Sequence, residues 1–358
     1  MKHKTVTAII LTILCLLSLV SCTPPTSGGQ TTTTTTQSFT QPSQTGVVVE
    51  GKGVFNNVDY TLYIPSSYNA DKEAPLLVAL HGGGQGTMND AKDNRQFFAD
   101  YTGLNAVAEK YGFIVAYPRQ STENHYYGYD YWNWYLQQSK KAKEPTAIYN
   151  IVGEIKRAYC IDDSRVFICG LSAGAAMAQI VAINYNTTFA GCCAVAGLTF
   201  ESSTIYGIND LQAYGPSIEP SLVVDRIYEA MGAGRVPAKL LVVTGTADTR
   251  VNPKNSTFMA ETWASTLARL EGKINHEIST ELTSEVHTGI DGVEYKKSIY
   301  ATLDNEEYCT LYEVVDMGHS WPGSSKGISI SITTGEDLGY KGGIDLNEVM
   351  CEFFGLNK

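Results

Sequence analysis

Residues 166–174 read Val-Phe-Ile-Cys-Gly-Leu-Ser-Ala-Gly, an apolar run that ends at a turn of small residues with Ser172 at its apex. A side chain held on so sharp a turn needs neighbours with almost no side chain two positions away, and Gly170 and Gly174 meet this need. Residues 173–183 are rich in Ala, Met and Gln, which are good helix formers. The pattern predicts a strand, a nucleophile elbow at Ser172 and a helix whose N-terminus favours negative charge.

Short apolar runs alternate with helical patterns along the rest of the chain. Several of these runs are continuously apolar, as expected for strands that are buried on both faces of a parallel sheet. The alternation predicts a three-layer α/β sandwich with a mostly parallel central sheet. The expected strands are 47–54, 60–64, 76–80, 114–117, 166–169, 192–196, 240–244 and 311–315, and the expected helices are 103–111, 146–158, 173–185, 253–270 and 346–354. We expect a lid or binding-loop region at 197–236 and a β-hairpin excursion at 271–308.

The first residues have the features of an export signal. Lys2 and Lys4 precede an apolar core that is too short to be a comfortable membrane span, so 1–21 are expected to be a signal peptide. The core ends in Leu-Val-Ser-Cys22, which resembles the bacterial lipobox. Cys22 is therefore the expected lipidation site, and the outer face of a bacterial membrane the expected location. An ordinary cleaved signal with a chance cysteine is the alternative.

The chain after the signal divides into two parts. Residues 22–45 are rich in Thr, Pro and Ser and offer almost nothing apolar to bury, so we expect a disordered stalk. Residues 46–358 show no second linker and no repeat, and they are expected to form one domain. We expect a monomer.

The charge balance restricts the partners. A net charge of −11 argues against nucleic acid, because little would neutralise its phosphates. The 22 tyrosines and the 18% of charged residues fit an extracellular protein that handles neutral, sugar-like or aromatic material, although a generic secreted surface explains them nearly as well.

The cysteines leave two interpretations open. An even number remains after the signal and Cys22, which permits disulfides in an exported protein, but buried thiols are equally compatible with their apolar surroundings. No spacing with histidines resembles a metal site, so we expect no metal and no cofactor. The six are Cys160, Cys169, Cys192, Cys193, Cys309 and Cys351.

Two later strands run into candidate partners for the serine. A serine hydroxyl needs a histidine to take its proton and an acid to orient that histidine. Residues 240–244 lead into Gly-Thr-Ala-Asp248, and 311–315 lead into Asp-Met-Gly-His319. The order Ser172, Asp248, His319 and the strand-end positions indicate a catalytic triad. A helix cap for Asp248 and a surface-loop role for His319 are the alternatives.

A glycine-rich turn follows the expected strand 76–80. It reads His81-Gly-Gly-Gly-Gln85, and glycines allow backbone N–H groups to approach a substrate oxygen closely. We expect an oxyanion hole formed by the N–H of Ala173 and by an N–H of Gly83, Gly84 or Gln85. A tight turn alone would also explain the glycines.

With these residues in hand, the chain resembles the secreted esterases of the α/β-hydrolase superfamily that include polyhydroxybutyrate depolymerases, feruloyl esterases and acetyl xylan esterases. The resemblance covers about 60–354, and its most specific segment is Gly-His-Ser-Trp-Pro-Gly at 318–323. It implies a three-layer α/β-hydrolase sandwich and the triad named above. It also implies that Trp321 packs beside the histidine and that Trp132 and Trp134 lie near a substrate cleft, and we expect all three to bind substrate.

The resemblance also implies a class of substrate. It points to ester side groups of plant cell-wall polysaccharide, with feruloyl groups as the first expectation and acetyl groups or polyhydroxybutyrate as alternatives. A cluster of aromatic residues is suited to stack on a phenolic or sugar ring, and core packing explains it equally well. Its members are Tyr126, Tyr127, Tyr129, Tyr131, Trp132 and Trp134. A non-catalytic binding lipoprotein and a peptidase of the same fold are more distant alternatives.

The chain departs from its relatives at one informative place. Many of them carry one cysteine two residues after the histidine of the His-Gly turn and another just before the Trp-Asn-Trp stretch. Here the two positions hold Gly83 and Tyr131. We therefore expect other contacts to hold the loop that carries the oxyanion donors.

Overall fold

The computed structural model describes 38–51, 53–56, 58–83, 94–120, 131–202, 212–272, 279–324 and 339–358, and Ser38–Lys358 form one compact unit. The expected signal peptide and Cys22 lie outside the described residues. The folded unit starts earlier than the expected boundary at residue 46. Phe39 packs against the core, and the Gln41 amide donates to the Tyr68 carbonyl (2.8 Å) and accepts from the Ala70 N–H (2.9 Å). In the described part of the chain, no helix combines the length and the apolar character needed to cross a membrane.

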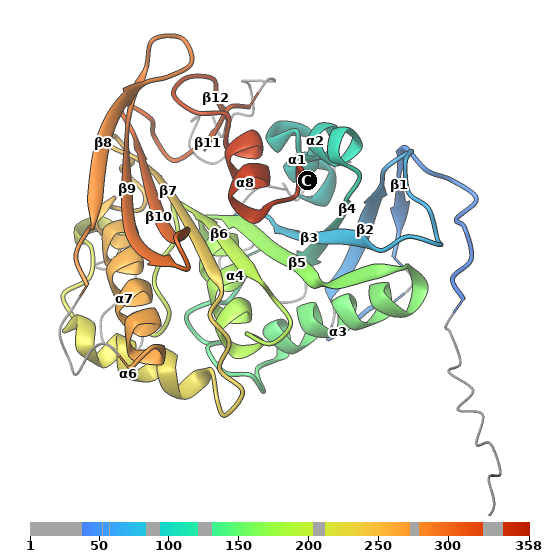
Figure 1. Ribbon diagram of the computed structural model, residues 1–358, viewed down its shortest axis with the longest axis horizontal. Coiled ribbons are helices and arrows are strands. Elements are labelled where there is room, and N and C mark those ends of the chain that lie inside the picture. The colour runs from blue at the N-terminus through green and yellow to red at the C-terminus, as the bar shows by residue number, and fades with distance from the viewer. Residues whose placement is uncertain are drawn as a thin grey trace, which may run out of the picture. The chain divides into compact units, whose positions relative to one another are not determined.

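A ten-stranded sheet runs through the middle of the described unit (Figure 1). The strands from β4 to β10 in its centre are parallel, and those on either side pair antiparallel, so the predicted mostly parallel sheet is confirmed. In spatial order the strands are β1 (Val47–Glu50), β2 (Val58–Ile64), β4 (Ile114–Gln120), β3 (Ala74–Leu80), β5 (Ile161–Leu171), β6 (Gly191–Val195), β7 (Lys239–Gly245), β10 (Glu306–Val314), β9 (Glu294–Leu303) and β8 (Thr283–Thr288). A separate small sheet pairs β11 (Trp321–Pro322) with β12 (Gly339–Tyr340).

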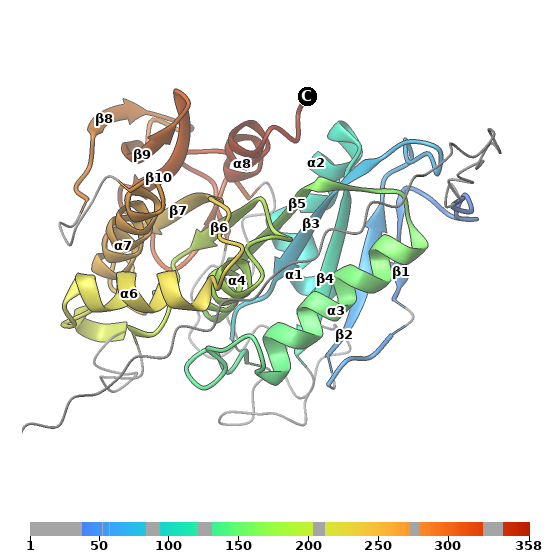
Figure 2. The same ribbon diagram turned by 60° about the horizontal axis from the view of Figure 1, so that its bottom comes forward.

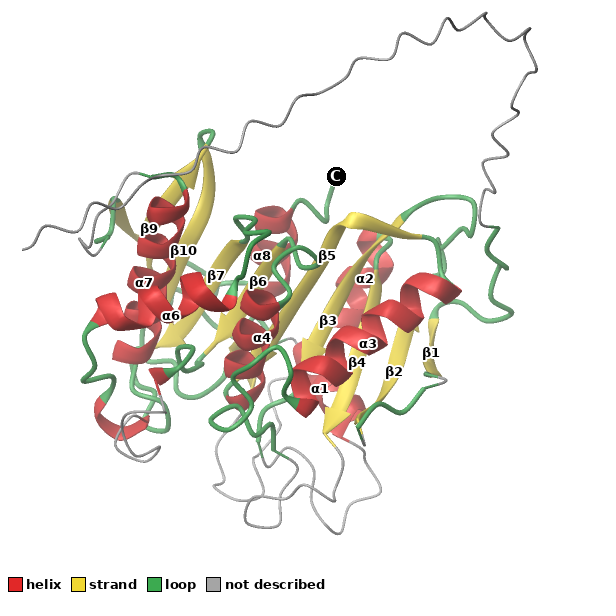
Figure 3. Ribbon diagram, turned by 90° about the horizontal axis from the view of Figure 1, so that it is seen from below, coloured by secondary structure: helices red, strands yellow, loops and turns green. Residues whose placement is uncertain are grey.

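Helices cover both faces of the sheet and complete the three layers (Figures 2 and 3). One face carries α1 (Asn94–Thr102), α2 (Leu104–Tyr111) and α8 (Leu346–Phe354), and the other carries α3 (Lys143–Ala158), α4 (Ala173–Asn184), α6 (Pro220–Ala230) and α7 (Lys254–Leu270). Successive residues of β3 alternate between the two cores, because a strand directs consecutive side chains to opposite faces. Leu76 and Val78 belong to the core under α3 and α4, whereas Leu77 and Ala79 belong to the core under α1 and α8.

The structure corrects the expected elements in two regions. The β-hairpin expected within 271–308 is present as β8 and β9, but it is not an excursion: β9 pairs antiparallel with β10 and β8 pairs antiparallel with β9, so both strands extend the main sheet. β8 is the outermost strand of the sheet and is largely exposed, which explains its polar sequence. The expected loop region 197–236 contains helix α6, whose Val223, Val224 and Ile227 are buried. Helix α1 was not expected from the sequence.

Candidate active site

Ser172 stands at a strained turn between β5 and α4. Its backbone angles, φ 58° and ψ −121°, lie where residues with side chains are rarely found. Its N–H donates to the Val195 carbonyl (2.8 Å), and its carbonyl accepts from the Ala176 N–H (3.0 Å), so the turn is held on both sides. A Cβ on Gly174 would lie 2.3 Å from the Leu80 carbonyl oxygen. The glycine therefore brings the start of α4 against the end of β3, and the predicted strand, turn and helix are all present.

Asp248 and His319 meet in a buried hydrogen bond. His319 Nδ1 lies 2.8 Å from Asp248 Oδ2, and the two side chains are 6% and 0% exposed. The other carboxylate oxygen accepts the backbone N–H groups of Arg250 and Val251, both at 2.9 Å. A carboxylate with this set of donors keeps the imidazole proton on Nδ1, which leaves Nε2 as the nitrogen that can take up a proton. The alternative of a surface-loop histidine does not fit this burial.

The loops that carry the acid and the histidine are joined by backbone contacts. β7 and β10 are parallel neighbours, and both loops start at their carboxyl ends. The Ala247 N–H donates to the Met317 carbonyl, and the Asp316 N–H donates to the Thr246 hydroxyl, each at 3.0 Å. A Cβ on Gly245 would lie 2.0 Å from the Met317 carbonyl oxygen, so only glycine allows this approach. β5, β6, β7 and β10 are parallel neighbours in that order, and therefore Ser172 lies at the same sheet edge as the Asp248–His319 pair.

The glycine-rich turn begins beside the elbow. The carbonyl oxygens of Leu80 and His81 face Gly174, next to Ala173, the first residue of α4. His81 is 1% exposed; its Nε2 accepts the Gln120 N–H (3.3 Å), and its Nδ1 lies 2.8 Å from the Gly82 carbonyl oxygen. Of the expected oxyanion donors, Ala173 and Gly83 are described, whereas Gly84 and Gln85 lie outside the described residues.

The three tryptophans expected near the substrate are buried completely. The Trp132 ring lies 5.3 Å from the His81 ring, and the Trp134 indole donates to the Tyr131 hydroxyl (2.8 Å). The Trp321 indole donates to Asn347 Oδ1 (3.2 Å). These contacts fit the core-packing alternative, and direct contact with substrate stays a prediction. Tyr126, Tyr127 and Tyr129 lie outside the described residues.

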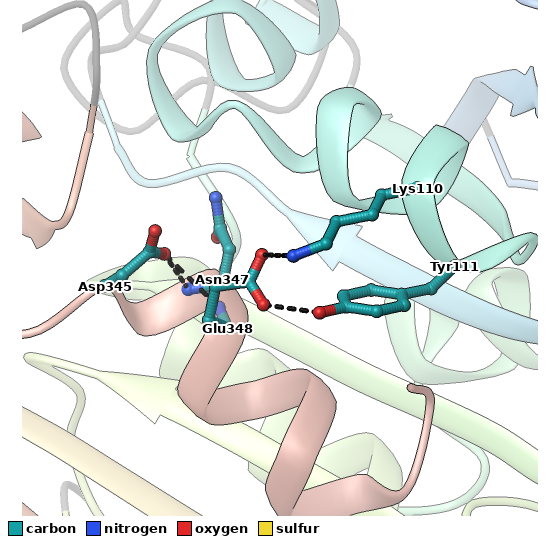
Figure 4. Close-up of polar contacts among 5 residues, drawn as sticks. All are labelled: Lys110, Tyr111, Asp345, Asn347 and Glu348. Atoms are coloured by element: carbon teal, nitrogen blue, oxygen red, sulfur yellow. Dashed lines mark hydrogen bonds and ion pairs between the residues drawn. The ribbon is translucent and has the colours of Figure 1, made fainter. Parts of the chain in front are cut away.

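Asn347, at the start of α8, holds the segment that follows His319. Asn347 was not identified as a site residue from the sequence. Besides accepting from Trp321, it donates through Nδ2 to the Thr102 carbonyl (2.7 Å). Figure 4 shows how this end of the helix is held: Asp345 caps it by accepting the N–H groups of Asn347 and Glu348, and the Glu348 carboxylate accepts from Lys110 and Tyr111 of α2. Neither the cap residue nor its neighbours across the fold were identified from the sequence.

Glu144 is a second functional candidate that sequence reasoning missed. It is 3% exposed, and its carboxylate accepts from Gln120 Nε2 (2.7 Å) and from Asn133 through both Nδ2 (2.6 Å) and the backbone N–H (2.9 Å). Burial raises the pKa of this carboxyl, and the hydrogen bonds from Asn133 and Gln120 oppose that rise. The expected helix began at residue 146, so Glu144 fell outside it.

The six cysteines named above are all free thiols, and five of them are buried. Within the described ranges, no group of three or more His, Cys, Asp or Glu side chains is placed to hold a metal ion.

Known proteins are similar to this chain in sequence. The chain is 26% identical over 273 residues to poly(3-hydroxyalkanoate) depolymerase C of Paucimonas lemoignei, covering 74% of this chain and 59% of that protein. It is 28% identical over 233 residues to acetylxylan esterase A of Emericella nidulans, covering 62% of this chain and 72% of that enzyme. The chain thus spans little more than half of the depolymerase.

Comparison with solved structures supports the fold. The acetyl xylan esterase of Aspergillus awamori superposes with a TM-score of 0.60 at 22% identity, covering 87% of this chain and all of that one. This likeness confirms the predicted α/β-hydrolase sandwich. Residues 58–286 match the family described as esterase PHB depolymerase. The protein accordingly belongs to the esterase PHB depolymerase family, a group of carboxylic ester hydrolases with the α/β-hydrolase fold.

Proposed function

We propose that this protein is a serine esterase in which Ser172 is the nucleophile, His319 the general base and acid, and Asp248 the orienting carboxylate. The buried 2.8 Å contact between His319 and Asp248 carries the proposal. It keeps the ring proton on Nδ1 and prepares Nε2 to accept the proton of a serine hydroxyl. The strained turn at Ser172, at the same sheet edge, supplies that hydroxyl.

The reaction proceeds by two acyl transfers. His319 Nε2 takes the Ser172 proton while Oγ attacks the ester carbonyl carbon, and the oxyanion accepts N–H bonds from Ala173 and from the segment Gly83–Gln85. The bond to the leaving alcohol then breaks, and His319 returns its proton to that alcohol. Water, deprotonated by His319, attacks the acyl-serine; the carboxylic acid leaves and the serine hydroxyl is restored.

The substrates we propose are ester side groups of plant cell-wall polysaccharide. The relatives named acetylxylan esterase support acetyl groups on xylan as the first candidate. Feruloyl groups as substrates are supported by the sequence resemblance alone. The relative named poly(3-hydroxyalkanoate) depolymerase supports an aliphatic polyester as a second candidate.

We also propose that the protein is exported and attached to the outer face of a bacterial membrane through lipid on Cys22. The apolar core and the lipobox-like stretch before Cys22 support this location. A tether of this kind would hold a monomeric enzyme against polysaccharide outside the cell, and the membrane would be contacted only through the lipid.

Replacing the nucleophile tests the proposed function. Ser172→Ala is expected to lower the turnover of p-nitrophenyl acetate by about 10⁶-fold, because the attacking oxygen is lost. Ser164→Ala, an exposed serine of the same strand, is the control and should retain full turnover. The wild type is then incubated with acetylated xylan, feruloylated arabinoxylan and poly(3-hydroxybutyrate), and the acetate, ferulate and 3-hydroxybutyrate released are measured.

Two outcomes would contradict the proposal. Turnover that survives Ser172→Ala in a folded protein would remove the serine from the mechanism. A wild type that neither hydrolyses any ester nor reacts with a fluorophosphonate would favour a binding protein. Release of acetate alone identifies a deacetylase, whereas release of 3-hydroxybutyrate alone favours the polyester.

A further inference from the structure

The turn that carries the expected oxyanion donors is held by contacts from one distant segment, 131–134. Gly83 packs against Tyr131 so closely that a Cβ on it would lie 2.3 Å from the tyrosine ring. The adjacent Trp132 ring lies 5.3 Å from the ring of His81. Consecutive residues of this segment therefore contact both described ends of the turn, His81 and Gly83.

The buried carboxylate of Glu144 also holds segment 131–134 in place. Asn133 donates to Glu144 through its backbone N–H and its side-chain amide, so the peptide directly after Trp132 is attached to the first turn of α3. Glu144 itself is anchored by its place in the helix, where the N-terminal end of the dipole favours a negative charge. The Trp134 indole, which donates to the Tyr131 hydroxyl, closes the segment on itself.

Gln120 connects the carboxylate to His81 by a second route. Its side-chain amide donates to Glu144 Oε1 (2.7 Å), and its backbone N–H donates to His81 Nε2 (3.3 Å). Since Nε2 accepts, the ring proton is on Nδ1, which donates to the Gly82 carbonyl oxygen at 2.8 Å. The ring thus holds the peptide that leads into Gly83.

We propose that Glu144, through Gln120 and through residues 131–134, is the positioning residue of the oxyanion hole. The inference deepens the proposed function and rests on it. Glu144 touches neither the serine nor the histidine in any contact described above, and it acts by keeping the turn at Gly83 in place beside the Ala173 N–H. In this chain, an aromatic ring against a glycine and a buried carboxylate perform the restraint that a covalent bridge would otherwise supply.

Glu144→Gln tests this role with a minimal change of shape. A carboxylate accepts all three donors, whereas the amide NH₂ of glutamine must face at least one of them and repel it. A shift of the turn by about 1 Å is expected to lower kcat for p-nitrophenyl acetate by about 10²-fold. KM should change less than kcat, because the donors bind the transition state more strongly than the ground state.

A boronic acid adds a readout that a purely structural role would not change. It forms a tetrahedral adduct with the serine and uses the same donors, so its affinity should fall with kcat. The matched control is Glu154→Gln, the same substitution further along α3, where the carboxylate accepts the Tyr60 hydroxyl of β2 (2.6 Å). It is expected to leave kcat and boronic acid affinity unchanged.

The outcomes separate this inference from the proposed function. A wild type without ester turnover overturns the proposed function and this inference with it. An active wild type whose folded Glu144→Gln variant keeps its kcat, or loses affinity in KM alone, overturns only the positioning role. A loss of kcat in Glu154→Gln equal to that in Glu144→Gln also overturns only the positioning role. If Glu144→Gln does not fold, Tyr131→Ala is the second test, because it removes the half-buried ring that packs against Gly83. This variant must lower kcat and boronic acid affinity together. Wild-type values for both would refute the proposal.

Discussion

Asp248 illustrates how much one buried side chain organises at this site. One of its oxygens accepts two backbone N–H groups of its own loop, and the other meets His319. The first set of bonds fixes the carboxylate, and the fixed carboxylate orients the imidazole. Because the carboxylate and the imidazole are buried, the pair depends on complementary donors and acceptors rather than on solvent.

Asp248→Asn is expected to preserve the shape of the site and to impair its chemistry. The two backbone N–H groups hold the asparagine oxygen, so its NH₂ faces Nδ1 and donates to it. The ring proton then moves to Nε2, the nitrogen that should take the serine proton. In the Ser-His-Asp mechanism this change lowers kcat by about 10⁴-fold. Steady-state kinetics together with a melting curve would check it. A variant of normal stability with wild-type kcat would contradict the assignment of Asp248.

At the scale of elements, the segment after His319 is held between helices on one face of the sheet. The Trp321 ring packs edge-on against Phe98 of α1, with 5.7 Å between ring centroids. Asn347 at the start of α8 accepts from the indole and donates to Thr102 at the end of α1. A Cβ on Gly323 would lie 2.6 Å from the Cα of Asp345, so this segment also approaches the α8 cap very closely. The position of the histidine thus depends on helices that carry no expected catalytic residue.

Trp321→Phe separates packing from substrate contact. It removes the indole N–H and leaves a buried Asn347 oxygen without that donor, which is expected to cost about 1–3 kcal/mol of unfolding free energy. We expect kcat to fall as the His319 segment loosens and KM to stay within about twofold, because the ring is completely buried. Denaturant unfolding and ester kinetics measure these effects.

Trp263→Phe is the matched control for that substitution. Trp263 is 2% exposed and its indole donates to the Ala238 carbonyl (3.1 Å), away from the site. It should lower stability by a similar amount and leave kcat unchanged. If Trp321→Phe instead raised KM strongly at unchanged stability, the contact with substrate implied by the sequence resemblance would be supported.

At the scale of the whole molecule, the folded unit includes a short stretch before its first strand. Phe39 packs against the larger core, and Gln41 exchanges two hydrogen bonds with the loop after β2. These contacts attach residues that composition alone assigns to the stalk. Residues 38–45 precede β1, which lies at the opposite end of the sheet from β8.

Shortening the chain tests where the folded unit begins. A variant starting at Ser38 is expected to match the full chain in stability and ester turnover. One starting at Gly46 loses the Phe39 packing and both Gln41 bonds, and should be less stable by about 1–3 kcal/mol with unchanged kcat. Thermal and urea unfolding of both variants decide the matter. Equal stability of the two would show that residues 38–45 behave as stalk.

Local pattern was enough to reveal the architecture of this protein and the order of its expected triad. Short stretches of sequence reveal strands that are buried on both faces, a serine flanked by glycines, and polar residues directly after strands. Each of these features depends on only a few consecutive residues. The roles of Glu144 and Asn347 could not be inferred in that way. Their partners, such as Gln120 and Trp321, come from other elements, and only chain packing determines which donor meets which buried acceptor. The same holds for the tryptophans: the resemblance implied a nearby cleft, core packing was the alternative, and only the tertiary structure shows that their rings are buried, because burial depends on elements far apart in the chain.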